Sequence, residues 1–255
     1  MNCSRLWFLS VVAALPMACV WADDPPPPNG VWTGKGQAGF VGSQGNTDAE
    51  SINAAIDMAL VDDQWKHTLH FGALYGESSG ITAAERWDAL WQSNYSLTTD
   101  LYTFGALRYE HDDFSGFEYQ GSVAAGLGYK ILNTDATKLS GQVGVGYRKS
   151  QPEELTKDAT GAVISRTLEP STSDAILTAG LDFSQVLTST TNLTNKFLME
   201  TGSSDTLYSD ALALTVKMSN KLALSLGYGV QDNTNPPAGL KKLDTVETVN
   251  LVYSF

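Results

Sequence analysis

Cysteine is nearly absent from this sequence, because its two cysteines, Cys3 and Cys19, both lie close to the N-terminus. The rest of the chain therefore forms neither a disulfide framework nor a cysteine-ligated metal site. Basic residues are also scarce, since 16 Lys and Arg stand against 28 Asp and Glu, which gives a net charge of −12. This charge excludes nucleic acid as a partner, because phosphate binding requires a basic surface.

Long hydrophobic runs are missing as well. Beyond residue 22, no stretch reaches the length of about 18 apolar residues that a transmembrane helix needs. Before that point, Arg5 precedes an apolar run over 6–15, which is too short to cross a bilayer. We therefore predict a cleaved signal peptide over 1–22 and a stiff Pro-rich linker over 23–30. A lipid anchor on Cys19 is the less favoured alternative, because Pro16 stands where such sites carry leucine.

The rest of the chain, 31–255, alternates apolar and polar residues with a period of two, which is typical of β-strands with two unlike faces. Many of the segments run longer than the about 5–6 residues of ordinary strands and match the about 9–11 of a tilted membrane strand. We therefore predict an all-β protein, a transmembrane antiparallel up-and-down β-barrel of about 12 strands. The segments are 31–42, 50–61, 65–75, 85–97, 101–111, 117–132, 137–149, 173–186, 191–202, 206–218, 221–231 and 243–255.

The connections between these segments tend to alternate between short and long. Short connections such as 62–64 and 98–100 predict periplasmic turns, and longer ones such as 76–84 and 150–172 predict outer loops. The connection at 203–205 is short where this rule expects a long one. Proline cannot donate a hydrogen bond within a sheet, and none occurs between Pro28 and Pro152. The four prolines from Pro152 onward all fall in predicted loops.

Aromatic residues gather near the ends of the predicted strands, as in the two interfacial belts of membrane barrels. We place one belt toward the turns and the other toward the loops. The turn-side residues are Trp65, Tyr95, Tyr129 and Tyr253, and the loop-side residues are Tyr75, Trp87, Tyr119, Tyr147 and Tyr228.

Two motifs resemble those of known barrels. The end of the chain has apolar or aromatic residues at Val249, Leu251, Tyr253 and Phe255, and this resembles the C-terminal assembly signal of bacterial outer-membrane barrels. The stretch from Gly39 to Thr47, with Gly45-Asn46-Thr47 at its end, resembles the opening of the salt-induced outer-membrane protein family. The first resemblance implies insertion by the outer-membrane assembly machinery, and the second implies location and fold but no catalytic residue.

The three histidines give little support for chemistry. His67 shares the parity of the outward residues, His70 falls on the inward parity, and neither belongs to a metal-binding pattern. His111 is followed by Asp112 and Asp113 at an outer loop, and a His beside an acid can act as a general base. We predict no enzyme, no cofactor and no metal, and keep an outer-membrane hydrolase with a rim site near His111 as an alternative.

Strand parity also assigns charged residues to the lumen of the barrel, where they are either mutually paired in a plug or arranged as a slightly basic channel for small anions. Both interpretations stay open at this point. The basic candidates are Lys35, Lys66, Arg86, Arg108, Lys130, Lys138, Arg148, Lys196 and Lys217. The acidic candidates are Asp57, Asp88, Glu110, Glu118, Asp182 and Glu200.

The sequence as a whole predicts an exported outer-membrane protein of a Gram-negative bacterium. We expect passive passage of small solutes, with anions preferred, or a structural role in adaptation to salt stress. Its expected partners are outer-membrane lipid, lipopolysaccharide and the assembly machinery. The oligomeric state stays open, and a soluble periplasmic barrel that binds a ligand is a further alternative.

Overall fold

The computed structural model describes residues 29–43, 49–113, 115–159, 162–237 and 240–255. The predicted signal peptide over 1–22, most of the linker over 23–30 and the Gly45-Asn46-Thr47 motif lie outside these residues. The described strands are β1 (Trp32–Ser43), β2 (Ala49–Asp62), β3 (Trp65–Ser78), β4 (Ile81–Ser96), β5 (Leu101–Asp112), β6 (Phe117–Asn133), β7 (Thr137–Lys157), β8 (Val163–Leu168), β9 (Thr172–Thr188), β10 (Thr191–Thr201), β11 (Thr206–Lys217), β12 (Leu222–Asn233) and β13 (Leu243–Ser254).

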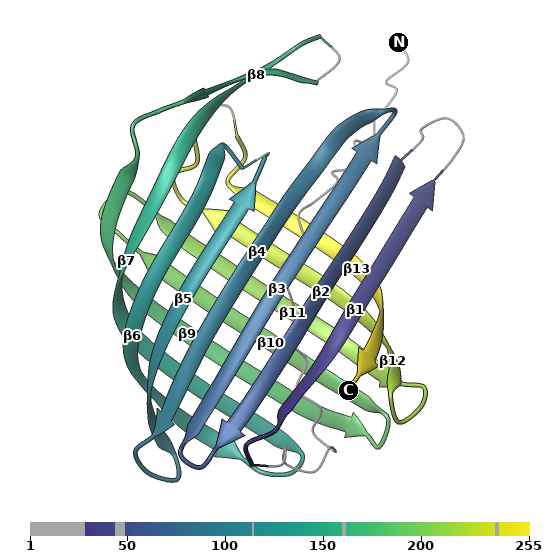
Figure 1. Ribbon diagram of the computed structural model, residues 1–255, viewed down its shortest axis with the longest axis vertical. Helices are drawn as coiled ribbons and strands as arrows, with labels where there is room; N and C mark the ends of the chain where they lie inside the picture. Colours follow the sequence, from purple (N-terminus) through teal and green to yellow (C-terminus); the bar gives the residue numbers. More distant parts are fainter. Residues whose placement is uncertain (1–28, 44–48, 114, 160–161, 238–239) are drawn as a thin grey trace, which may run out of the picture.

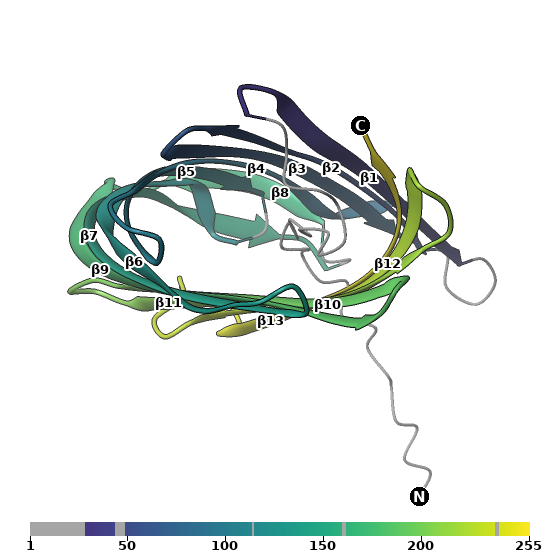
Figure 2. The same cartoon turned by 90° about the horizontal axis from the view of Figure 1, so that it is seen from below.

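Twelve of these strands form a closed antiparallel barrel, which confirms the predicted fold (Figure 1). Each of these strands pairs with its neighbour in the chain, except that β7 pairs with β9 across β8, and β1 pairs with β13 to complete the ring. The barrel has a flattened, oval outline when it is viewed from the end that carries the short turns (Figure 2). We call this the turn end and the opposite end the loop end. No described helix is long and apolar enough to cross a membrane.

The pairing between β1 and β13 is the shortest junction of the ring. It joins four residue pairs, from Lys35 with Ser254 to Ala38 with Leu251, whereas the other junctions of the barrel each join eleven or more. Phe255 adds two backbone hydrogen bonds, because its N–H donates to the Gly34 carbonyl at 2.9 Å and its own carbonyl accepts from the Gly34 N–H at 3.0 Å. We call this junction the seam.

The outer face of the barrel is apolar, because alternate residues along each strand point away from the interior. On β7, Val143 and Val145 are each 64% exposed, while Arg148 on the other face is 4% exposed. Aromatic rings meet on this outer face at both ends: Trp65 and Tyr95 have centroids 4.9 Å apart at the turn end, and Trp87 and Tyr109 also 4.9 Å apart toward the loop end. Such a surface fits a lipid bilayer between two aromatic belts.

Inside the barrel, two aromatic side chains of β5 cover glycines on the neighbouring strand β6. A Cβ atom on Gly128 would lie 2.1 Å from the Tyr102 ring. One on Gly126 would lie 2.1 Å from the Val143 carbonyl oxygen of β7 and 2.9 Å from the Phe104 ring. Tyr102, Phe104 and Ala124 form a buried apolar cluster. Glycine is therefore required at these positions because the rings, and at Gly126 also the backbone of β7, occupy the space of a side chain.

The predicted outer loop over 150–172 is wrong in most of its length. Strand β7 continues to Lys157 and turns back as β8, so the two strands form a hairpin that stands beyond the barrel wall (Figure 1). Pro152 lies inside β7 rather than in a loop, opposite Phe117 at an irregularity in the β6–β7 pairing. A bulge tolerates proline because the ladder is interrupted there.

Candidate functional site: the charged interior

The structure places fourteen of the fifteen charged lumen candidates on the inward face of their strands, which is the face that carries the buried residues. They are Lys35, Lys66, Arg86, Arg108, Lys130, Lys138, Arg148, Lys196, Lys217, Asp57, Asp88, Glu110, Asp182 and Glu200. Glu118 differs, because it lies in an irregularity of the β6–β7 pairing between Phe117 and Tyr119, at the rim of the loop end. An irregular strand loses its strict alternation there, so parity fails.

Four of these side chains, those of Lys35, Asp57, Arg108 and Arg148, lie on a single row of register across neighbouring strands. Because the strands of a barrel are tilted, such a row winds around the wall from the turn end toward the loop end. The row runs through Leu90 and otherwise carries polar residues: Lys35, Asp57, His70, Arg108, Ser122, Arg148 and Asp174. The charged side chains of this row therefore lie at successively different heights in the barrel, rather than in a ring at one height.

Successive contacts join the charged groups of this region, beginning on β1. The Lys35 ammonium lies 4.0 Å from Asp57, and His70 Nδ1 lies 2.6 Å from the other oxygen of Asp57. His70 Nε2 lies 3.4 Å from Asp88 on β4. Both ring nitrogens of His70 therefore face carboxylate oxygens, Nδ1 at hydrogen-bond distance from Asp57 and Nε2 at ion-pair distance from Asp88. His70 is only 9% exposed, so it is a buried structural link between two strands.

The contacts continue on β4 and β5 through two arginines that share one carboxylate. Glu110 accepts from Arg108 at 2.7 Å and lies 3.2 Å from Arg86. Arg108 also lies 3.7 Å from Glu200 on β10, which accepts a hydrogen bond from Ser122 at 3.1 Å. We call the connected residues the ion-pair band: Lys35, Asp57, His70, Asp88, Arg86, Glu110, Arg108 and Glu200.

The ion-pair band bridges strands that are not neighbours in the ring. Arg108 on β5 and Glu200 on β10 come from walls separated by β6, β7 and β9, and Arg86 on β4 donates to Gln231 on β12 at 3.5 Å. Arg86 is 3% exposed and Glu110 is 5% exposed. The band therefore narrows the interior at its own level, and it does so with charges that are paired.

A second group of charges lies nearer the turn end and is built from lysine. Lys66 on β3 lies within electrostatic range of Lys130, Lys138 and Lys196 on β6, β7 and β10, with Asp182 as an acidic neighbour. We call the four lysines the lysine cluster. Lys130 Nζ donates to the Thr99 carbonyl at 2.9 Å. Among the described residues, none of the four has a carboxylate within the 4.0 Å of an ion pair. The interior thus has paired charge in the band and a local excess of positive charge below it.

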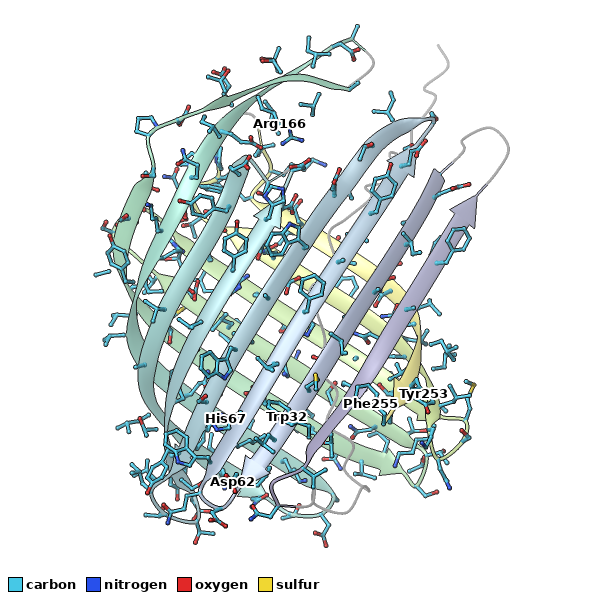
Figure 3. The ribbon with its side chains drawn as sticks, viewed as in Figure 1. Trp32, Asp62, His67, Arg166, Tyr253 and Phe255 are labelled. Atoms are coloured by element: carbon cyan, nitrogen blue, oxygen red, sulfur yellow. The ribbon has the colours of Figure 1, made fainter. Side chains whose placement is uncertain are left out.

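The loop-end rim holds the residues of the hydrolase alternative. His111 Nε2 lies 3.1 Å from Asp113, and His111 Nδ1 contacts the Glu118 carbonyl. Arg166 of β8 reaches the same place, 3.0 Å from Asp113 and 2.7 Å from Glu153 (Figure 3). Because both nitrogens of His111 face acceptors, neither is placed to take a proton from a substrate. This group joins the β7–β8 hairpin to the rim.

A neighbouring rim contact ties β9 to the turn between β10 and β11. The Ser203 and Ser204 hydroxyls donate to the Asp174 carboxylate, Ser203 at 2.5 Å. These hydrogen bonds hold the pKa of Asp174 below its ordinary value. Arg148 pairs with Asp205 of the same turn. This turn is short, as the sequence indicated, and it is fixed by charge-assisted contacts.

The sequence interpretation missed the role of His70. It also missed Asp205 and Gln231 as partners of Arg148 and Arg86, and Ser122 as a donor to Glu200. A signal for His70 was present. It and Asp57 lie equally far from the tight turn at 63–64, and equal distances from such a turn make two residues cross-strand partners. The other partners come from strands far apart in sequence. Among the described residues, no group of three or more His, Asp or Glu side chains could hold a metal ion.

Comparisons with known proteins find one similar curated protein and several similar solved structures. The chain is 24% identical over 239 residues to the uncharacterized protein YdiY of Escherichia coli strain K12, covering 91% of this chain and 86% of that protein. Among solved structures, it resembles the NanC porin at 13% identity, with 88% of this chain and 99% of that chain covered and a TM-score of 0.46. It also resembles the translocator domain of the autotransporter NalP from Neisseria meningitidis at 15% identity, with 90% of each chain covered and a TM-score of 0.47.

None of these matches carries the salt-induced designation, so that part of the resemblance stays a prediction. A family model covers most of the barrel, since it matches residues 36–255. The chain therefore belongs to the family described as protein of unknown function, DUF481.

Proposed function

We propose that this protein is an outer-membrane barrel through which small solutes pass passively, with anions preferred over cations. The observation that carries the proposal is the lysine cluster in the interior. Lys66 and Lys138 face inward and are exposed to solvent, as is their acidic neighbour Asp182. Unpaired charge that water reaches inside a barrel sets the selectivity of a pore, because it attracts counter-ions to the lumen.

The outer surface supports a bilayer rather than water as the surroundings of the barrel. Large apolar side chains are exposed on successive strands, including Leu107, Val123, Val143 and Leu177. Each such side chain forgoes about 1.5–3 kcal/mol of burial when it is left in water. A soluble ligand-binding barrel would not expose a continuous apolar face of this kind.

The proposed location brings partners with it. An exported barrel of this type reaches the outer membrane through the assembly machinery, and the C-terminal residues Val249, Leu251, Tyr253 and Phe255 are the proposed recognition signal. All four are outward and exposed. In this orientation the turn end faces the periplasm, and the loop end faces lipopolysaccharide.

A structural role is the second candidate, and the ion-pair band favours it. If paired charges fill the interior, the barrel is closed to solutes and serves the envelope by its presence, for example during salt stress. The hydrolase alternative has weaker support because His111 has both nitrogens engaged.

Single-channel recording in planar bilayers separates the two candidates. A pore gives discrete conductance steps, and a KCl gradient gives a reversal potential that reports anion preference. The double variant Lys66→Gln/Lys138→Gln should move this potential toward zero, whereas Lys149→Gln, at an exposed outward position, should leave it unchanged. An absence of conductance steps would refute the pore and favour the structural role. Lipid and peptide hydrolase screens with His111→Ala as control test the enzyme.

A further inference from the structure

The lysine cluster is the place in this barrel where like charges converge from both walls. Lys66 comes from β3 and Lys196 from β10, which lies opposite β3 in the ring. Lys130 and Lys138 come from β6 and β7, which lie between them along the wall. Asp182 is the acidic group recorded near Lys66 and is also the cross-strand partner of Lys196. Around Lys66, three other ammonium groups therefore stand against this one carboxylate among its strongest charge neighbours, so positive charge is in excess there.

The inward arginines differ from these lysines because they form ion pairs. Arg86, Arg108 and Arg148 each have a carboxylate at ion-pair distance. The four lysines lack such a partner among the described residues, so nothing in this part of the fold neutralises them as Glu110 and Asp205 neutralise the arginines. Converging like charges repel each other, and an anion that binds between them removes this repulsion.

The geometry also selects the kind of anion. A monovalent ion neutralises one ammonium group, whereas the four groups stand on both sides of the interior. A molecule with two or more negative groups can meet lysines of both walls at once. Lysine is a flexible, strongly hydrated point charge without the planar fork of arginine. The cluster therefore suits small anions of varied shape that bind and leave, rather than one anion held in fixed geometry.

The position of the ion-pair band determines from which end of the barrel an anion can reach the lysine cluster. It lies between the loop end and the lysine cluster, and its side chains are buried except for that of Arg108, with Arg86 3% and Glu200 4% exposed. Lys66 and Lys138 are exposed and stand next to the turn-end termini of β3 and β7. An anion therefore meets the cluster from the turn end without crossing the band.

We infer that the lysine cluster is a binding site for small anions with two or more negative charges, such as polycarboxylates or polyphosphates, that enter from the turn end. The inference rests on the proposed function for its periplasmic side and for the pore that the bound anion would obstruct. It goes further in giving the site, the valence of the ligand and the side of entry.

The test uses tripolyphosphate and citrate as probes on the full-length barrel in planar bilayers. Ser219→Cys, in a turn at the turn end, provides a thiol with which a membrane-impermeant reagent identifies that side of each inserted barrel. We expect tripolyphosphate on the turn side to reduce the KCl current at a concentration at least tenfold lower than on the loop side. Lys66→Gln/Lys138→Gln should weaken this block at least tenfold, and Lys149→Gln should preserve it.

Equal block from the two sides, or block that the double variant leaves unchanged, would overturn the inference while leaving the pore intact. If the barrel carries no current, the pore fails, and calorimetric titration of the barrel in detergent then decides the site alone. Heat of tripolyphosphate binding that is lost in the double variant and kept in Lys149→Gln supports the site. An absence of binding, or binding that is equal in all three proteins, refutes it.

Discussion

Replacing Glu110 by glutamine tests whether the ion-pair band is dry. Glu110 is the shared partner of Arg86 at 3.2 Å and of Arg108 at 2.7 Å, and it is 5% exposed. The substitution keeps the shape of the side chain and removes its charge, so two guanidinium groups lose their common counter-ion. Removing one partner from a buried ion pair costs about 3–5 kcal/mol. We expect about 3 kcal/mol for Glu110→Gln, because Arg108 keeps Glu200 at 3.7 Å.

The free energy of unfolding can be measured by urea titration of the barrel in lipid vesicles, with tryptophan fluorescence and heat-modifiable migration on gels as two readouts. Glu85→Gln is the matched control, since this carboxylate is exposed and lies on β4 beside Arg86. We expect it to change stability by less than about 0.5 kcal/mol. The double variant Glu110→Gln/Arg86→Gln should be more stable than Glu110→Gln, because it leaves one buried cation fewer.

A loss of less than about 1 kcal/mol for Glu110→Gln would refute the reasoning, because solvent-screened ion pairs contribute amounts of that size. Water would then fill the interior at the level of the band. The proposal of a closed barrel with a structural role would then lose its main support, and the same result would favour the proposal of a pore.

Three further predictions concern other parts of the barrel. Gly128→Ala should lower stability by about 1–3 kcal/mol in the same urea titration because the tyrosine ring that covers it must move, whereas Gly36→Ala should be neutral, with nothing within 4 Å of the new Cβ. Arg166→Ala should release the β7–β8 hairpin and speed its cleavage by protease, with a stability loss below about 1 kcal/mol since the side chain is partly exposed. The lowered pKa of Asp174 means that its contact stabilises the fold above the ordinary Asp range and is lost as the pH falls through the lowered value. Ser203→Ala should move the Asp174 titration, followed by NMR, upward toward that range, and an unchanged titration would contradict the hydrogen bond.

The positions of the twelve barrel strands could be predicted because the pleat of a strand imposes a period of two on any sequence with one apolar face. The hairpin of β7 and β8 could not, because it stands beyond the membrane-facing wall and its residues need no alternation. Pro152 marked this stretch as a loop, although an irregularity in the β6–β7 pairing accommodates the proline within a strand.

In the interior, too, some features could be predicted from the sequence and others could not. Parity assigned Lys35, Asp57 and Arg108 to the inward face because it depends only on neighbours along the strand. The contact between Arg108 and Glu200 depends on the tilt and closure of the whole ring, which no local pattern records. The separation of paired arginines from the lysine cluster likewise becomes visible only when residues from six strands are placed at their levels.

The seam has a consequence for the order of events when the barrel forms. Its four residue pairs and the backbone hydrogen bonds of Phe255 join the first strand of the barrel to the last. Until β13 has been synthesised and delivered, β1 has no permanent partner on that side, and its free edge must be protected for the whole time that the other strands are made. The moment of closure is therefore set by the arrival of a few residues of β13, and the chain remains an open sheet until that moment.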